Sequence, residues 1–242
     1  MRKKPVSTAI AVATACALVF PAAAQAASAP QALSVSVLAH GTKSGTSVVS
    51  GEIKPGTEVH VDASPAGAAQ PNGSPRWLNI DYQVQETGYW CAPAATRIAL
   101  SARMAPPSQG DLAAQLGTTV DGTDWIGQVT GVLNNNLGGG WYETKEMPSD
   151  PPTQEQRDRL WNDIVYDIDR NYPLVANIVA PAGNHPPGYP DYTIYHYFTV
   201  FGYDPVDRTV TIADPANFGG NQIYWISFDQ LASLIPPKGY AA

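Results

Sequence analysis

Helical periodicity comes before strand patterning along this chain, and that order restricts its fold more than any other feature. Apolar residues recur with helical spacing in four segments, at 91–100, 112–116, 125–133 and 160–168. Short β-branched and aromatic runs then follow, at 174–179, 193–203, 209–212 and 222–226. Helices followed by antiparallel strands are typical of an α+β fold, whereas a βαβ fold would alternate the two. The sequence therefore predicts an α+β domain.

Several element ends can be predicted from local residue chemistry. The segment 108–111 resembles a capping box before the second helix, and Gly117 would end that helix. The segment 153–156 is a cap for the helix at 160–168. Asp204-Pro-Val-Asp207 predicts a turn, so the strands on either side of it would form a hairpin.

The N-terminus has the pattern of a secretory signal peptide over residues 1–26. Three basic residues at 2–4 precede an apolar run at 8–20, and Ala24-Gln25-Ala26 supplies a small-x-small cleavage pattern. Cys16 lies within this run, and the residues before it resemble a lipobox only weakly, so a lipid anchor is the weaker alternative. We therefore expect a secreted, extracellular protein without a membrane-spanning segment.

Residues 27–75 differ in composition from the rest of the chain. They are rich in small residues and contain no aromatic residue, although short strands are possible at 33–38, 46–49 and 58–61. This segment is either a flexible spacer or a pro-segment that restrains the mature domain until export. All six tryptophans and all twelve tyrosines follow, so we expect the folded domain to cover residues 76–242.

The charge of the chain argues against two classes of partner. The formal net charge is −7, and loss of the three basic residues at 2–4 would make it −10. A protein of this charge is repelled by the phosphates of nucleic acids and by anionic membrane surfaces. We therefore expect neither as a partner.

Cys91 is the only cysteine that remains after removal of residues 1–26. An unpaired thiol in a secreted protein either pairs with another molecule or stays free and reactive. A glycine-containing loop leads into Cys91, and Pro93 then fits the first turn of a helix. Because the positive end of a helix dipole stabilises a thiolate, the sequence predicts a reactive cysteine at a helix N-terminus.

A cysteine nucleophile needs a base within hydrogen-bonding reach. His40 and His60 lie in the low-complexity segment, and His185 lies in a loop rich in proline and glycine. His196 lies on a predicted strand, which holds an imidazole more rigidly than a loop does. We therefore predict that His196 is the base.

The base in turn needs an orienting partner. Asp214 ends the second strand of the predicted hairpin, so antiparallel pairing would bring it towards His196. Asn217 is an alternative, because an amide can also orient a histidine. The developing oxyanion needs donors, for which we predict the backbone N–H of Cys91 and the side chain of Gln85, with Gln83 as the alternative.

Other chemistries have little support in the sequence. It contains no Cys-x2-Cys pair and no His-Glu-x2-His motif, so we expect no metal site and no cofactor. Glu143 and Glu146 lie on a probable strand, but nothing in the pattern indicates a glycosidase pair.

Taken in order, the segments Gln85-x5-Cys91-Ala-Pro-Ala, His196–Asp204 and Ala213-Asp214-Pro-Ala resemble the C39-like branch of the papain-like cysteine peptidases. The resemblance covers about residues 78–235. It implies a papain-like fold and a Cys-His-Asp triad with a glutamine oxyanion donor, at Cys91, His196, Asp214 and Gln85.

The best-known members of that family are peptidase domains of bacteriocin exporters, which cut leader peptides after a Gly-Gly pair. This sequence has no membrane-spanning bundle and no phosphate-binding loop, so leader processing does not follow from the resemblance. We expect a hydrolase that cleaves peptide or amide bonds through a thioester. The alternatives are a cell-wall amidase or transpeptidase that uses the same site, and a non-catalytic binding module with the same fold.

Overall fold

The computed structural model of the protein describes residues 33–36, 45–47, 55–63, 73–220 and 222–242. The signal peptide expected at 1–26 and His40 lie outside these ranges. The α-helices are α1 Cys91–Ser101, α2 Gln109–Leu116, α3 Ile126–Leu137, α4 Gln154–Ile168 and α5 Phe228–Leu234. The strands are β1 Leu33–Ser36, β2 Gly45–Ser47, β3 Glu58–Asp62, β4 Arg76–Trp77, β5 Ile80–Gln83, β6 Thr144–Glu146, β7 Leu174–Ala180, β8 Ile194–Asp204, β9 Thr209–Ala213, β10 Ile223–Ser227 and β11 Gly239–Ala241.

The larger sheet has eight strands, and its neighbouring strands are antiparallel. Seven of them follow the order β2-β10-β9-β8-β7-β11-β6, and β4 pairs with the far end of β8. The long central strand β8 pairs with β7 along seven residues and with β9 over its second half. The predicted hairpin is therefore confirmed, and the side chain of Asp204 accepts hydrogen bonds from two backbone N–H groups of its turn.

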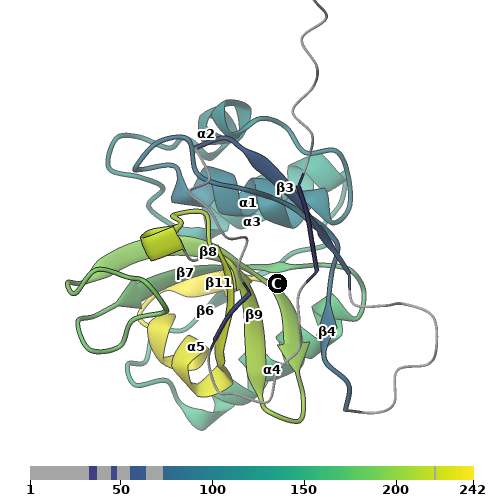
Figure 1. Ribbon diagram of the computed structural model, residues 1–242. Coiled ribbons are helices and arrows are strands. Elements are labelled where there is room, and N and C mark those ends of the chain that lie inside the picture. The colour runs from purple at the N-terminus through teal and green to yellow at the C-terminus, as the bar shows by residue number, and fades with distance from the viewer. Residues whose placement is uncertain (1–32, 37–44, 48–54, 64–72, 221) are drawn as a thin grey trace, which may run out of the picture. The chain divides into compact units, whose positions relative to one another are not determined.

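Helices cover both faces of this sheet, as Figure 1 shows. Because side chains alternate along a strand, Leu174 and Ala176 pack with α4 and α5, whereas Val175 packs with α1, α2 and α3. This confirms the predicted α+β fold, in which the helix that begins at Cys91 packs against an antiparallel sheet carrying His196.

Small side chains let α1 lie close to the sheet. Ala92, Ala95 and Ala99 have no exposed surface, and each is one turn or nearly one turn from the next. The hydroxyl of Thr199 on β8 donates to the backbone oxygen of Ala95 at 2.8 Å. The position of α1 along β8 is therefore fixed, and with it the position of Cys91.

The predicted helix ends are also found. Ser108 accepts a hydrogen bond from the backbone N–H of Asp111 before α2, and Gly117 ends that helix with φ 66°. Thr153 and Gln156 form a capping box before α4. The sequence patterns did not predict β5, α5 or β11.

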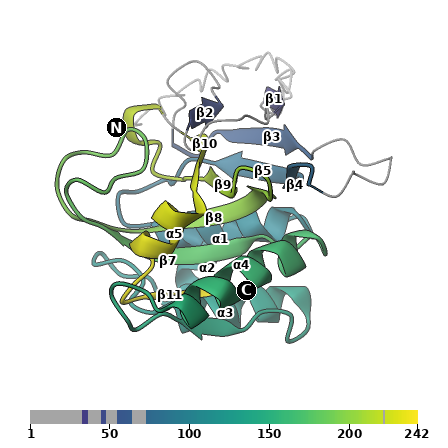
Figure 2. The ribbon, with the colours of Figure 1, turned by 90° about the horizontal axis from the view of Figure 1, so that it is seen from below.

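Strand β3 belongs to the folded core, although it lies within the low-complexity segment 27–75. It pairs with β5 in the smaller sheet, whose order is β1-β3-β5 (Figure 2). Val59 and Val61 are fully buried in a cluster that includes Ile98 of α1. Because these contacts hold β3 against the domain, residues 58–62 are not a flexible spacer.

Candidate active site

Cys91 is the first residue of α1 and is half-buried. Burial by itself raises the pKa of its thiol. The hydrogen bond with His196, the charge of that imidazole, and the backbone N–H groups of Tyr197 and Ala92 outweigh this effect, so that the pKa lies below its ordinary value. The thiol of Cys91 is therefore more readily ionised than that of a free cysteine.

The N–H of Tyr197 is available to the thiol because strand β9 is short. Strand β9 ends at Ala213, which pairs with Thr199 of β8. Tyr197 lies two residues beyond this point, and its N–H bonds to Cys91 instead of to another strand. Because the pairing of β9 with β8 ends at Ala213, the sulfur atom of Cys91 can accept a hydrogen bond from the backbone of β8.

The structure brings His196 and Asp214 together. His196 is 3% exposed, and its Nε2 atom lies 2.8 Å from Oδ1 of the fully buried Asp214. Because Asp214 takes Nε2, the hydrogen bond between His196 and Cys91 uses Nδ1. Burial lowers the pKa of His196, but the charge of Asp214, the hydrogen bond to it and the interactions with Cys91 together outweigh burial and hold that pKa well above its ordinary value. The surroundings of the two side chains therefore favour a thiolate–imidazolium pair.

The Asp214 carboxylate accepts hydrogen bonds from four donors. Oδ1 accepts from His196 and from the backbone N–H of Ala216 at 2.9 Å, and Oδ2 accepts from the hydroxyls of Tyr189 at 2.6 Å and Tyr224 at 2.7 Å. Burial raises the pKa of Asp214, but the positive charge of His196 and these donors lower it below its ordinary value. Asp214 is therefore held as a carboxylate.

The backbone of Asp214 is fixed as well. Its carbonyl oxygen accepts a hydrogen bond from the Tyr82 hydroxyl at 2.8 Å, and its N–H donates to the carbonyl of Gln222 at 2.7 Å. Tyr82, Tyr189 and Tyr224 were not predicted from the sequence to belong to the site. Alternation along 222–226 marks Tyr224 as a strand residue, but no pattern in the loop at 181–190 singles out Tyr189.

Gln85 joins the loop that leads to Cys91 to the residues that follow Asp214. Its backbone N–H donates to the carbonyl of Pro215 at 2.9 Å, and its side-chain Nε2 donates to the carbonyl of Thr87 at 2.8 Å. Since an amide nitrogen carries two hydrogens, one remains for another acceptor. Its Oε1 is buried and has no partner among the described residues.

Gln83, the alternative oxyanion donor, has both ends of its amide in use. Its Nε2 donates to the carbonyl of Gly56 at 2.7 Å, and its Oε1 accepts from Gln109 at 2.9 Å. The same Gln109 amide also bonds the backbone of Val84 and Glu86, so it holds the loop that leads to Cys91. This role of Gln109 was not predicted, because the sequence pattern indicates only that the residue lies at the start of a helix.

The remaining candidate residues lie in other contacts. Asn217, the alternative orienting residue, has φ 55°. Its buried Oδ1 has no hydrogen-bond partner among the described residues, whereas the imidazole of His196 contacts Asp214. The Nε2 atom of His185 lies 3.0 Å from the carbonyl of Tyr192, and its ring stacks on Tyr189. His60 pairs with Asp81 on the neighbouring strand.

A cavity of about 220 Å³ lies beside the thiol. It is lined by Cys91 and His196, by the loop between α2 and α3, by Asn177 and Tyr197 of the sheet, and by Lys238. A group that binds in this cavity would lie beside the Cys91 side chain.

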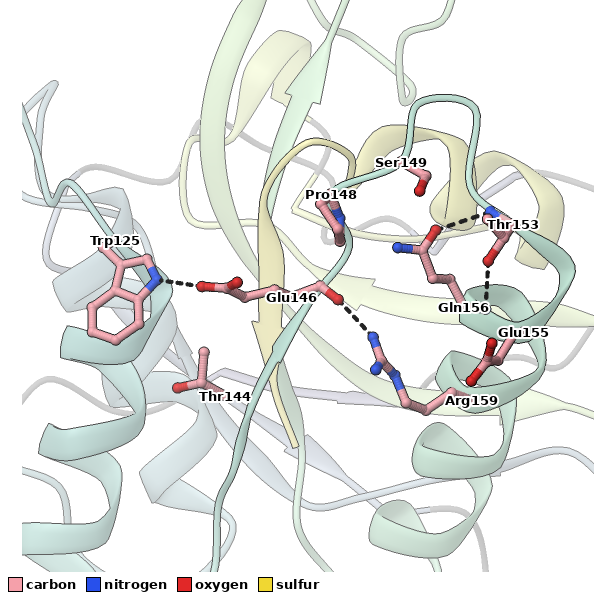
Figure 3. A pocket seen from close by; sticks show the side chains of 9 residues that line it. All are labelled: Trp125, Thr144, Glu146, Pro148, Ser149, Thr153, Glu155, Gln156 and Arg159. Atoms are coloured by element: carbon pink, nitrogen blue, oxygen red, sulfur yellow. Dashed lines mark hydrogen bonds between the residues drawn. The ribbon is translucent and has the colours of Figure 1, made fainter.

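A larger hollow of about 650 Å³ lies at the start of α3 and α4 (Figure 3). In it, the indole N–H of Trp125 donates to the Glu146 carboxylate at 3.2 Å, and Arg159 donates to the backbone oxygen of Glu146 at 2.6 Å. Glu143 pairs with Lys145 instead of with Glu146. Neither a thiol nor an imidazole is among the residues that line this hollow, and Glu143 does not line it.

Two further properties concern the described part of the chain. None of its helices is long and apolar enough to cross a membrane. Within the same ranges, no three side chains of histidine, cysteine, aspartate or glutamate gather where a metal ion could bind.

Comparison with known proteins gives one family. The sequence model of the Peptidase C39-like family matches residues 77–234, well over half of the chain. None of the curated proteins compared with the chain matches it.

Two similar solved structures can be described. One is a double-glycine motif protease from an AMS/PCAT transporter in complex with the leader peptide, at 13% identity and TM-score 0.42, covering 68% of this chain and 91% of that one. The other is the peptidase domain of Streptococcus ComA, a bifunctional ABC transporter, at 18% identity and TM-score 0.43, covering 65% of this chain and 93% of that one.

Proposed function

Because the chain belongs to the Peptidase C39-like family and is a cysteine peptidase-like hydrolase, we propose that it cleaves peptide or amide bonds with Cys91, His196 and Asp214 as its triad. One observation carries the proposal: His196 hydrogen-bonds both Cys91 and the buried carboxylate of Asp214. A non-catalytic module would have no need of a thiol with a lowered pKa.

The first half of the reaction forms a thioester. The Cys91 thiolate attacks the carbonyl carbon, and the carbonyl oxygen becomes an oxyanion. The backbone N–H of Cys91 and the remaining N–H of Gln85 Nε2 stabilise that oxyanion. The His196 imidazolium then gives its proton from Nδ1 to the leaving amine as the C–N bond breaks.

The second half releases the acyl group. His196, now neutral, takes a proton from water, and the hydroxide attacks the thioester carbonyl. The C–S bond breaks, the acid leaves, and the thiolate–imidazolium pair is restored. Throughout, Asp214 keeps the ring orientation and favours imidazolium over imidazole.

We also place the enzyme outside the cell. The signal-peptide pattern at 1–26 supports export. Removal of residues 1–26 would leave Cys91 without a second cysteine in the chain, which suits a thiol that must remain free in an oxidising compartment.

Intact-mass analysis of the exported protein, with and without a peptide-like thiol electrophile, tests both parts. We expect a mass that begins near residue 27 and a single adduct on Cys91. In a peptide-hydrolysis assay, Cys91→Ala should have no activity while its circular dichroism matches the wild type. Wild-type rates of hydrolysis in that variant would refute the thiol mechanism.

A further inference from the structure

We propose that the cavity beside Cys91 binds a positively charged, N–H-rich group of the substrate, namely an ammonium or a guanidinium group. This inference rests on the proposed function and adds a class of substrate to the same site.

Two carboxylates line the cavity together with the thiol. Asp121 and Asp124 are exposed residues of the loop between α2 and α3. Paired backbone hydrogen bonds between Thr119 and Gly122, both 3.0 Å long, hold this loop in shape. Neither carboxylate has an ion-pair partner among the described residues, so both charges are available to a ligand.

A buried amide oxygen supplies a third acceptor. Asn177 lines the cavity and is 5% exposed. The hydroxyl of Tyr197 donates to the carbonyl of Thr123 at 3.1 Å, so it must accept from Nδ2 of Asn177, which lies 2.8 Å away. This chain of hydrogen bonds fixes the orientation of the amide. The Oδ1 atom accepts no hydrogen bond from the described residues, which leaves it free for a donor.

Lys238 is the one lysine or arginine among the residues that line the cavity. Its ammonium lies 5.8 Å from the centre of the Tyr195 ring, and it offsets only one of the two carboxylates. Since the Cys91–His196 pair is neutral as a whole, the lining keeps a net negative charge and three acceptors. A ligand with several N–H donors and a positive charge matches this lining, whereas an anionic group would be repelled.

Thiol modification tests the inference without any peptide substrate. The probes are 2-aminoethyl and 2-sulfonatoethyl methanethiosulfonate, which carry opposite charges and form the same kind of mixed disulfide. The rate at which each modifies Cys91 is measured by mass spectrometry and divided by its rate with an unstructured cysteine peptide. We expect a normalised preference for the cationic probe of roughly tenfold at low salt, which falls as salt screens the carboxylates.

Two matched variants separate the cavity from the net charge of the chain. Asp121→Asn with Asp124→Asn should reduce the preference to near one. Glu155→Gln with Asp158→Asn removes two exposed charges from α4, neither of which lines the cavity, and should leave the preference unchanged. Equal preferences in the wild type and the Asp121/Asp124 variant would overturn the inference.

Peptide cleavage then identifies the source of the cation. Peptides with lysine, norleucine or glutamate at each position around the cleaved bond are compared by kcat/KM. Lysine should exceed norleucine at one position by roughly tenfold, mainly through KM, and the Asp121/Asp124 variant should lose this difference. If no position prefers lysine although peptides are cleaved, the inference fails and the proposed function stands. If the cationic probe is preferred but no peptide is cleaved, the proposed function fails instead.

Discussion

At the scale of single residues, Asp214 determines how the other two members of the site behave. Its carboxylate accepts four hydrogen bonds, and its backbone carbonyl and N–H each form one more. These bonds hold the side chain in its orientation towards His196. The imidazole is thereby held as imidazolium, and the imidazolium in turn stabilises the Cys91 thiolate. This dependence leads to three predictions about individual side chains.

The first concerns pH. The pKa of Cys91 is lowered and that of His196 is raised, so kcat/KM should rise as the thiol ionises at low pH and fall as the imidazolium loses its proton at high pH. In His196→Ala, alkylation of Cys91 should require a pH above about 8. His185→Ala is the control, and its pH profile should match the wild type. The assignment of the base is wrong if the two variants exchange these behaviours.

The second concerns Tyr224, a positioning residue. Tyr224→Phe removes one donor from Oδ2 of Asp214, so the pKa of Asp214 should rise and its more basic carboxylate should stabilise the His196 imidazolium more strongly. The alkaline limb of the kcat/KM profile should then move to higher pH, and unfolding should become easier by about 1–3 kcal/mol. Tyr203→Phe removes a hydroxyl that donates to Asp169 away from the site. It should lower stability without moving the profile, and matching profiles for both variants would contradict the role of Tyr224.

The third concerns the oxyanion. Gln85→Ala should lower kcat by roughly 10²-fold with little change in KM, because the amide acts only as charge develops on the oxygen. Gln83→Ala serves as the comparison, since both ends of that amide are bound within the fold. It should affect the free energy of unfolding more than kcat. A larger loss of kcat in Gln83→Ala would exchange the two roles.

At the scale of elements, the sequence predicted those features that depend only on residues close together in the chain. The caps of α2 and α4 and the β8–β9 hairpin follow from local turn and capping chemistry, and all are found. The placement of β11 between β7 and β6 depends on partners far apart in the sequence. Its three residues carry no periodic pattern of their own, so it could not be predicted.

The same reasoning explains what could be predicted of the site. Cys91, His196 and Asp214 stand at element ends or on strands, where sequence patterns locate them. Tyr189 reaches Asp214 from an irregular loop, and Tyr82 reaches it from β5, across more than a hundred residues. Such contacts depend on tertiary packing, which no local pattern records.

The role of β3 gives a prediction for an element. Val59 and Val61 are fully buried, so replacing both with alanine should cost roughly 2 kcal/mol for each, from lost methyl burial and the cavity left behind. Urea unfolding measures this cost. Asp62→Ala changes the exposed end of the same strand and should have little effect. Unchanged stability in the double variant would show that β3 is dispensable.

At the scale of the whole molecule, the buried His196–Asp214 pair should shape stability against pH. The contribution of Asp214, whose pKa is lowered, is present above about pH 3.9 and is lost as pH falls through its pKa in the folded protein. The contribution of His196, whose pKa is raised, is complete below about pH 6.5 and is lost as pH rises through its folded pKa. Urea midpoints should therefore be highest between about pH 4 and 6.5, and His196→Gln should lack the alkaline decline. Parallel curves for the two proteins would contradict this.

The volume of the cavity beside the thiol, about 220 Å³, has a consequence for which molecules the enzyme can attack. Sites that enclose a whole small ligand measure about 300–1,000 Å³, so this one admits a single side chain and leaves the rest of a polypeptide outside. For the proposed peptidase activity, we therefore expect cleavage in flexible segments that can pass Cys91, such as tails, linkers and unfolded chains, in preference to tightly packed ones.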